Sequence, residues 1–222
     1  MTNVKIEIDS TVNDIVTLGV IEFSHLKCQP KNFDLWIEIE ELVKKYNHQY
    51  SSTSVALNKL KPARDLYRAM GIEPTKIRPS SEALFRRAIK NKPLYQINSI
   101  VDVSNYVSLS IFLPIGLYNR DKITGNIVLR TGYENEFYKG IGKDIVHVTG
   151  RLTLTDSIGP FGNPSSDSLR TSIDLKSQNV LMILFAPKHY PEIMLQQHLD
   201  YSAELMTRFH PSGLISQNVI LK

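Results

Sequence analysis

Apolar residues recur every three or four positions between residues 100 and 111, which is the spacing of one face of a helix. The stripe consists of Ile100, Val103, Val107 and Ile111. Asn98 or Ser99 can cap the start of this helix, and Pro114 cannot continue it because proline has no backbone N–H to donate. Many residues here are β-branched, which disfavours a helix, but intrinsic propensity is a weak prior.

Polar side chains lie outside that apolar stripe. Asn105 shares a flank of the predicted helix with Asp102 and Ser108. After Pro114 the chain turns and enters an apolar-rich strand at residues 127–130. If this polar flank of the helix lies beside the strand at 127–130, the two can form the wall of a pocket.

The N-terminal part of the chain predicts two strands followed by a helix. Residues 4–8 alternate between apolar and polar positions, and residues 18–26 form a second strand. Residues 33–50 have the pattern of an amphipathic helix that packs on a core. Its apolar positions are Phe33, Trp36, Ile37, Ile39, Leu42 and Val43.

Two further helices are predicted before the central one. Pro62 suits the first turn of a helix and Gly71 suits its C-terminal cap. Ser80 or Ser81 can cap the next helix, in which Glu82 complements the positive end of the helix dipole.

The pattern becomes rich in β-structure beyond residue 130. Apolar segments on both sides of residues 149–151 predict a hairpin. Residues 158–171 contain too much Gly, Pro and Ser for regular structure and predict a long loop, which is either functional or disordered. A buried strand is expected at residues 179–185, a helix at 191–209 and an edge strand at 219–221.

The composition is that of an ordinary globular protein. The chain has 222 residues, of which 42% are hydrophobic and 22% are charged, and it can form one substantial core. No apolar run approaches the roughly 18 residues of a transmembrane helix, and residues 1–5 do not begin a signal peptide. The single cysteine, Cys28, excludes an internal disulfide, so we expect a reduced, cytoplasmic setting.

Positive charge is concentrated between residues 59 and 92. This basic segment holds ten lysines and arginines against three acidic residues, a local balance of +7, and because the whole chain carries +4 the rest sums to −3. Such a segment can contact the phosphates of a nucleic acid. The alternative is that these side chains only solvate helix faces, as charge runs commonly do.

The chain lacks the usual motifs of cofactor and metal sites. Its six histidines show no i, i+4 pairing, and there is no phosphate-binding loop, dinucleotide-binding glycine pattern or nucleophile elbow. We therefore expect neither a metal nor another cofactor. Asp156, Asp167 and Asp174 could converge, but acids near loops are mostly solvated. These patterns alone predict an α+β protein with a basic segment.

The stretch around the central helix resembles a known family. A valine-aspartate pair at 101–102 leads into Asn105-Tyr106-Val107, then to Pro114 and to a strand that begins with Gly125 and ends with Arg130. This order and spacing is similar to the B3/4 domain of the phenylalanyl-tRNA synthetase beta subunit, the editing module that hydrolyses mischarged tRNA. The run at residues 78–83 also resembles stand-alone B3/4 proteins, which lack a synthetase body.

The resemblance implies a set of site residues. Asn105 takes the place of the family's pocket asparagine and Thr171 that of a pocket threonine, so these two are the implied catalytic residues. The implied substrate-binding residues are Asn119, Arg130, Gly159 and Gly162. From the basic segment, Arg78, Arg86, Arg87 and Lys90 are the candidate RNA-binding residues, and the helix N-terminus after Arg78 can also attract an anion.

Two positions depart from the family's pattern. The family's pocket histidine falls on Gly116, and the glutamate that recognises a tyrosine hydroxyl falls on Ile183. Ile183 cannot accept a hydrogen bond, and a buried unpaired hydroxyl costs about 1 to 3 kcal/mol. Tyrosine-specific proofreading is therefore not expected. Either the pocket takes a different aminoacyl group, or the domain binds without hydrolysing.

Three functions remain open at this point. The first is a free-standing aminoacyl-tRNA editing or tRNA-binding protein, with aminoacylated tRNA as its partner and no membrane association. The second is a non-enzymatic RNA- or ligand-binding protein that kept the fold. The third is a hydrolase of small aminoacyl or peptide-like esters.

The expected fold is α+β, with a mainly β C-terminal half packed by helices. One B3/4-like domain is expected to span residues 1–222. Within it we expect an N-terminal α/β lobe at 1–77 and the region of closest resemblance at 78–190.

Overall fold

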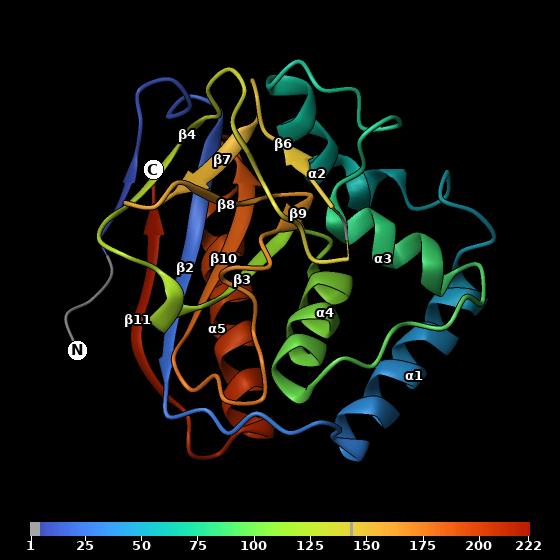
Figure 1. Ribbon diagram of the computed structural model, residues 1–222. Helices are drawn as coiled ribbons and strands as arrows, with labels where there is room; N and C mark the ends of the chain where they lie inside the picture. The colour runs from blue at the N-terminus through green and yellow to red at the C-terminus, as the bar shows by residue number, and fades with distance from the viewer. Residues whose placement is uncertain (1–4, 143) are drawn as a thin grey trace.

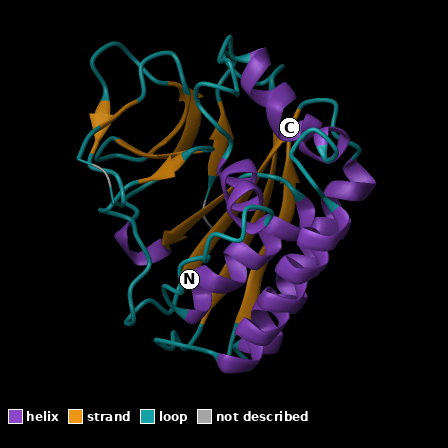
Figure 2. Ribbon diagram, turned by 90° about the vertical axis from the view of Figure 1, so that its right-hand side faces the viewer, coloured by secondary structure: helices purple, strands orange, loops and turns teal. Residues whose placement is uncertain are grey.

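Two β-sheets pack face to face in the computed structural model, which describes residues 5–142 and 144–222. Helices cover the other face of one sheet, so that strands and helices lie on opposite sides of the molecule in Figure 2. The expected α+β class is therefore confirmed. The two ends of the described chain both contribute strands, β1 and β11, which appear at the left of Figure 1.

The helix-covered sheet has the strand order β11-β2-β10-β3, and all its neighbours are antiparallel. Its strands are β2 (Val16–Ser24), β3 (Ile115–Asn119), β10 (Val180–Pro187) and β11 (Leu214–Leu221). Side chains alternate along β10: Met182 and Leu184 face the helices, whereas Leu181 and Ile183 face the second sheet. Burial on both faces explains why this strand is a continuous apolar run.

The second sheet has the order β1-β4-β7-β8-β9. Its strands are β1 (Ile6–Ile8), β4 (Ile127–Thr131), β7 (Leu152–Thr155), β8 (Pro160–Asn163) and β9 (Ser166–Asp167). β1 and β4 are parallel, and the other neighbours are antiparallel. A separate pair joins β5 (Phe137–Tyr138) to β6 (Val146–His147).

The helices pack against the first sheet and against each other. They are α1 (Phe33–Gln49), α2 (Leu57–Ala69), α3 (Ser80–Ala88), α4 (Ser99–Ile111) and α5 (Glu192–Phe209), and a 3₁₀ turn, η1, spans Arg120–Lys122. Four rings from α1, α3 and the end of α4 form an aromatic cluster with centroid separations of 5.2 to 5.7 Å. These rings belong to Tyr46, Tyr50, Phe85 and Phe112.

The central helix begins and ends where the sequence predicts. The Asn98 side chain accepts a hydrogen bond of 3.0 Å from the Val101 N–H, which caps α4. Phe112 adopts a left-handed conformation with φ 62° two residues before Pro114, so the helix cannot continue. Ile100, Val103 and Val107 of the apolar stripe are buried in the core, as expected, and Ile111 is partly buried against it.

One expected helix start and one expected helix cap are wrong. α2 begins at Leu57, which places Pro62 inside the helix; the buried Leu60 and Leu66 on either side hold the helix despite the missing N–H. α3 begins at Ser80 with Pro79 in the capping position, and neither serine hydroxyl of α3 caps it. Both hydroxyls are buried without a hydrogen-bond partner among the described residues.

The expected core face of α1 also needs correction. Phe33 and Ile37 are exposed, at 77% and 57% of their surface. The other expected positions do pack on the core: Ile39 is buried, and Trp36, Leu42 and Val43 lie against it. Leu35 and Tyr46 complete the buried face.

The expected hairpin around residues 149–151 is not formed. A turn is present, with Gly150 at φ 69° and the Arg151 N–H bonded to the Val148 carbonyl, but β6 pairs with β5 and β7 pairs with β4 and β8. The expected long loop at 158–171 contains β8 and β9. The first error arises because β7 pairs with β4, which is distant in the sequence. The second arises because β8 and β9 are very short strands with weak local signals.

Candidate functional site

The two positions that depart from the editing pattern lie next to each other. Gly116 on β3 pairs directly with Ile183 on β10. Ile183 faces the space between the two sheets, and Tyr118, two residues after Gly116, faces the same space. The Tyr118 ring meets the ring of Phe161 edge-on, with centroids 5.0 Å apart. The sheet register thus brings together the two positions at which the resemblance implies pocket residues.

The Tyr118 side chain fills the space beside Gly116. A β-carbon built on Gly116 would lie 2.7 Å from Tyr118 Cζ, and a β-carbon on Gly162 would lie at the same distance. The ring is therefore clamped between two glycine backbones, and both Tyr118 and Ile183 are fully buried. A side chain larger than hydrogen cannot enter at position 116 unless Tyr118 moves.

Asp167 lies at the hydroxyl end of Tyr118. Its backbone pairs with Gly162, and its Oδ2 accepts a hydrogen bond of 3.3 Å from the Leu117 N–H. Burial raises the pKa of Asp167 to about 7, despite the opposing contacts with Tyr118 and Leu117. Neither Asp167 Oδ1 nor the Tyr118 hydroxyl has a partner of good hydrogen-bond geometry among the described residues. The space between the sheets therefore ends in a buried carboxyl that is partly neutral near pH 7.

We expect Asp167→Asn to stabilise the protein at alkaline pH. The folded-state pKa of Asp167 is raised above the unfolded value of about 3.9, so the stability due to the neutral carboxyl is lost as the pH rises through 7. Asparagine remains neutral, and the gain should be roughly 2 to 4 kcal/mol above pH 8 and close to zero near pH 4.

Urea unfolding of the wild type and this variant between those pH values measures the gain. Asp14→Asn, which removes an exposed carboxylate, is the control and should change stability little. A gain from Asp167→Asn that does not depend on pH would contradict the account of this carboxyl.

Asn119 and Thr171 lie close together, but their side chains have structural partners. The Asn119 N–H donates to the Thr171 carbonyl at 2.8 Å, and the Asn119 amide bonds Ser177 Oγ at 2.9 Å while accepting from the Asp121 N–H at 3.0 Å. Thr171 is fully buried and its N–H donates to Ser168 Oγ at 3.3 Å. These contacts fix the segment that follows β9 against the end of β3.

Gly159 and Arg130 lie elsewhere. Gly159 has φ 141° and its N–H donates to Asp156 Oδ1 at 3.2 Å in the turn between β7 and β8. Arg130 on β4 makes two hydrogen bonds of 2.7 Å to Glu136, and its guanidinium lies 3.7 Å from the ring centroid of Tyr133. The structure thus does not bring the four implied substrate-binding residues to one cavity.

Asn105 lies on the side of α4 that faces α1 and α3. It lines a small cavity of about 100 Å³ together with Trp36, Arg87 and Tyr95. Its amide makes no hydrogen bond to another residue in the described ranges, whereas the neighbouring Asp102 is buried and accepts from the Trp36 indole at 2.9 Å. Asn105 is therefore an unengaged amide in an aromatic groove, which we call the Asn105 groove.

The basic segment is only partly available for an external partner. Arg86 donates to Glu82 at 2.9 Å. Arg87 donates to the Pro93 carbonyl at 2.7 Å and lies 4.3 Å from the Tyr95 ring centroid. Arg78 and Lys90, in contrast, are exposed and have no ion-pair partner among the residues described. These last two cations stand at opposite ends of α3.

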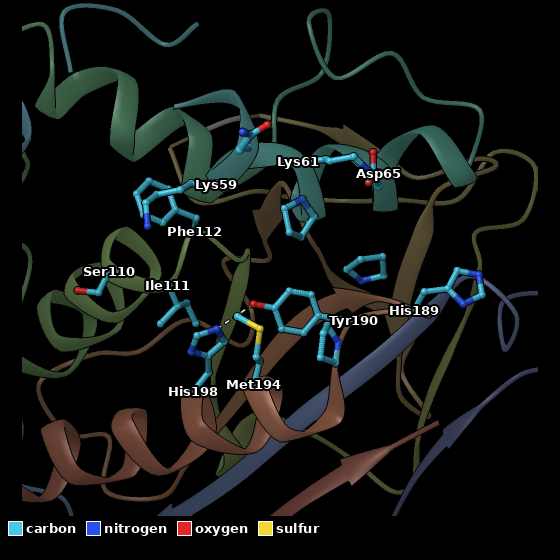
Figure 3. Close-up of a pocket in the computed structure, with 14 residues that line it drawn as sticks. Lys59, Lys61, Asp65, Ser110, Ile111, Phe112, His189, Tyr190, Met194 and His198 are labelled. Carbon is cyan, nitrogen blue, oxygen red and sulfur yellow. Dashed lines mark hydrogen bonds and ion pairs between the residues drawn. The ribbon is translucent and has the colours of Figure 1, made fainter. Parts of the chain in front are cut away.

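A much larger cavity lies between α2, the end of α4 and the start of α5 (Figure 3). Its volume is about 630 Å³, within the range of small-molecule sites. Tyr190, Met194 and His198 project into it from α5 and the turn before it, and Lys59 and Phe112 lie opposite. We call this space the α2–α5 cavity.

A neutral polar pair forms part of the wall of the α2–α5 cavity. The Tyr190 hydroxyl and His198 Nε2 are hydrogen-bonded at 2.8 Å, shown as a dashed line in Figure 3. Burial lowers the pKa of His198, so its imidazole is uncharged at neutral pH. The pair can donate and accept hydrogen bonds without presenting a charge.

Sequence reasoning missed Tyr118 and the α2–α5 cavity. A signal for the first was present, because residues two apart on a strand share a face and Tyr118 follows Gly116 by two. No comparable signal marks the cavity, whose walls come from three segments separated by 45 residues or more. Asp156 and Asp174 do not join Asp167, since they pair with Arg170 and Lys122.

Metal-binding clusters and membrane-spanning helices are both absent from the described ranges. No group of three or more His, Cys, Asp or Glu side chains there could hold a metal ion. None of the helices in those ranges combines the length and apolar character needed to cross a membrane.

The protein is an α+β domain, the fold class that the resemblance implies. It has two stacked sheets with helices on one outer face, and Tyr118 lies between the sheets, clamped by two glycines. The B3/4 domain family matches residues 62–209, which is about two thirds of the chain. The protein belongs to the B3/4 domain family.

Curated relatives support this membership. The phenylalanine–tRNA ligase beta subunit of Protochlamydia amoebophila (strain UWE25) is 28% identical over 165 residues, which covers 70% of this chain and 20% of that protein. The beta subunit of Rickettsia bellii (strain RML369-C) is 42% identical over 79 residues, covering 35% of this chain and 9% of that protein. The chain thus spans a fifth or less of the length of these relatives.

A solved structure shares the fold. An N-terminal fragment of the phenylalanyl-tRNA synthetase beta subunit from Pyrococcus horikoshii superposes with a TM-score of 0.51 and 12% sequence identity. The match covers 100% of this chain and 55% of that fragment. At this level of identity the likeness concerns the fold alone.

Proposed function

We propose that this protein binds tRNA and does not hydrolyse an aminoacyl ester at the position that the synthetase editing domain uses. The observation that carries the proposal is the filled space at Gly116, where Tyr118 occupies the volume that a side chain at position 116 would need. Hydrolysis requires water near the carbonyl and donors where negative charge develops. Gly116 and Ile183 supply neither a general base nor a donor.

Binding to tRNA is supported by the family and by the available charge. Curated relatives are subunits of a tRNA ligase. Arg78 and Lys90 flank α3, whose nine residues span about 14 Å, enough to reach several phosphates along a strand. The Asn105 groove lies beside α3 and presents Tyr95 stacked on Arg87, an arrangement suited to an unpaired base.

The protein acts as one unit in the cytoplasm. β1 and β2, from the first 77 residues, pair with β4 and β10, so this segment completes both sheets. Burial raises the pKa of the half-buried Cys28 thiol, which favours its unreactive form in a reducing compartment.

Reversing the charge at both ends of α3 is expected to weaken tRNA binding. In the double variant Arg78→Glu/Lys90→Glu, two phosphate contacts become repulsive, and the affinity should fall at least about tenfold. The plot of log affinity against log salt concentration has a negative slope, and this slope should become less steep by about 2. Fluorescence anisotropy with labelled tRNA at several salt concentrations measures both.

The matched control is Lys31→Glu/Lys176→Glu, which makes the same charge change at two exposed lysines outside the basic segment. It should leave the slope nearly unchanged. Equal losses in the two double variants would indicate a non-specific charge effect and contradict the proposed surface.

A further inference from the structure

We propose that two copies of this chain associate through strand β11, which pairs with its counterpart around a twofold axis at Val219. The inference is independent of the proposed tRNA binding. Its basis is the free outer edge of β11, the partly buried apolar side chains on both faces of that strand and a stretch of sequence that can pair with itself.

The outer edge of β11 is open to a further strand. β11 is the last strand of the helix-covered sheet, and β2 is its only strand neighbour in the part of the chain that the structure describes. The backbone N–H and C=O groups that point away from β2 therefore form an edge that can accept another strand. Figure 1 shows this edge at the left of the molecule.

Apolar side chains on both faces of β11 are only partly covered. Val219 and Leu221 pack at the margin of the core between the sheets, and Ile220 packs at the margin of the core under the helices. Neighbouring strands lie about 4.8 Å apart, so that side chains on the same face touch. A further strand on this edge would therefore cover all three side chains.

β11 lacks most of the features that protect an edge strand from association. Natural edges are commonly blocked by lysine, proline or a bulge. Residues 214–221 contain no charged residue and no proline. The pairing of β11 with β2 has one irregularity, between Ile215 and Gln217, and is regular from Gln217 to Leu221. The regular stretch at 217–221 is therefore the part of the edge that is open to pairing.

This stretch suits a second copy of the chain because an antiparallel pair around a twofold axis repeats the same contacts on both sides. With the axis at Val219, the two copies of Val219 lie opposite each other. Asn218 then lies opposite Ile220 of the partner subunit. Gln217 lies opposite Leu221 of the partner subunit. No like charges meet in this register, and each of the apolar side chains gains a neighbour.

The size of the edge indicates a weak, reversible dimer. β11 has eight residues and spans about 27 Å. The two sheets and the helical layer make the edge about 20 Å thick, so that two such edges in contact bury roughly 1,000 Å² in total, at the lower end for a specific interface. Helix α3 lies on the opposite side of the molecule in Figure 1, so both proposed tRNA surfaces stay free in the dimer.

Sedimentation equilibrium over a range of protein concentrations tests the association. We expect the mass of the wild type to rise from one chain towards two. Gln217→Lys/Leu221→Lys places like charges opposite each other and should weaken the dimer at least about tenfold. Gln217→Lys/Leu221→Glu changes the same two positions to opposite charges and should dimerise within about threefold of the wild type. Phe33→Lys, at a position on α1 that is 77% exposed, is the control for an added surface charge and should dimerise normally.

Cysteine cross-linking tests the register in a Cys28→Ser background. Val219→Cys places the two thiols directly opposite each other, with Cα atoms about 4.5 to 5.5 Å apart, which a disulfide can bridge. Ile220→Cys is the matched control, because its two copies are diagonal neighbours about 7 to 8 Å apart, too far for a disulfide. Under mild oxidation we expect a covalent dimer of Val219→Cys alone.

Three results would overturn the inference. One is the mass of a single chain at every concentration of the wild type. Another is equal dimerisation of the two double variants at positions 217 and 221, which would place the contact on another surface. The third is equal cross-linking of Val219→Cys and Ile220→Cys, which would exclude the proposed register.

Discussion

Gly116→His is expected to destabilise the protein by about 3 kcal/mol, although a histidine is what the resemblance to the editing domain implies at this position. The new β-carbon would lie 2.7 Å from Tyr118 Cζ, and the imidazole would extend further into a space that is fully buried. Tyr118 cannot retreat because its other side is equally close to Gly162. Chemical denaturation of the purified variant measures the loss.

A smaller residue at position 118 should relieve the clash. Leucine lacks the Cε, Cζ and hydroxyl atoms that approach Gly116, so Gly116→His/Tyr118→Leu should be more stable than the sum of the two single changes predicts. The coupling energy should be roughly 1 to 3 kcal/mol. Additive effects would mean that Tyr118 does not occupy the space at Gly116, and the account of the filled pocket would fail.

Glu82→Ala should cost about 3 to 5 kcal/mol, because it leaves a buried guanidinium without its counter-charge. The Glu82 carboxylate is fully buried and accepts two hydrogen bonds of 2.7 Å from Arg64 and one of 2.9 Å from Arg86. These bonds join α2 to α3. Thermal and urea unfolding of the variant measure the cost.

Two further variants test whether the cost of Glu82→Ala comes from the burial of the ion pair. Asp65→Ala removes the acidic partner of an exposed ion pair on α2 and should cost less than about 1 kcal/mol. Arg64→Met/Glu82→Leu replaces the buried pair with apolar side chains of similar size and should recover most of the stability. A similar cost for Asp65→Ala and Glu82→Ala would contradict the importance of burial.

The same carboxylate should make acid unfolding steeper. Burial acts to raise the pKa of Glu82, but the hydrogen bonds from Arg64 and Arg86 outweigh it and hold the pKa below its usual value. A depressed folded-state pKa contributes stability that is present above about pH 4.3 and is lost as the pH falls through the folded value. This loss should be absent in Arg64→Met/Glu82→Leu.

The central helix could be predicted closely from the sequence because its signals are local. The Asn98 cap, the apolar stripe and the proline that follows act within a span of 17 residues. The same holds for α5 and β10. A long amphipathic pattern favours a helix at α5, and a short continuous apolar run favours a buried strand at β10. Tertiary contacts confirm these local preferences and do not override them.

Other features could not be predicted because they depend on pairing across the chain. Glu82 was expected to complement a helix dipole, but it is bound by Arg64, 18 residues earlier. The two short strands β8 and β9 were expected to be loop, since Gly162 and Pro164 are poor strand residues. Gly162 is placed there because the Tyr118 ring approaches its backbone.

The side chains at two positions illustrate that a fold does not fix its chemistry. The backbone register places Gly116 beside Ile183, the positions at which the resemblance implies a histidine and a glutamate, and neither side chain can act as an acid or base. Tyr118 occupies the space beside Gly116.

Hydrolysis of mischarged tRNA under saturating protein tests this account most directly. A panel of mischarged aminoacyl-tRNAs is incubated with wild type and with Asn105→Ala at concentrations where tRNA binding is complete. We predict that the ester is lost at the rate seen in buffer with both proteins, although both bind the tRNA. Accelerated loss of one aminoacyl group with the wild type, abolished in Asn105→Ala, would contradict the account and establish an editing enzyme.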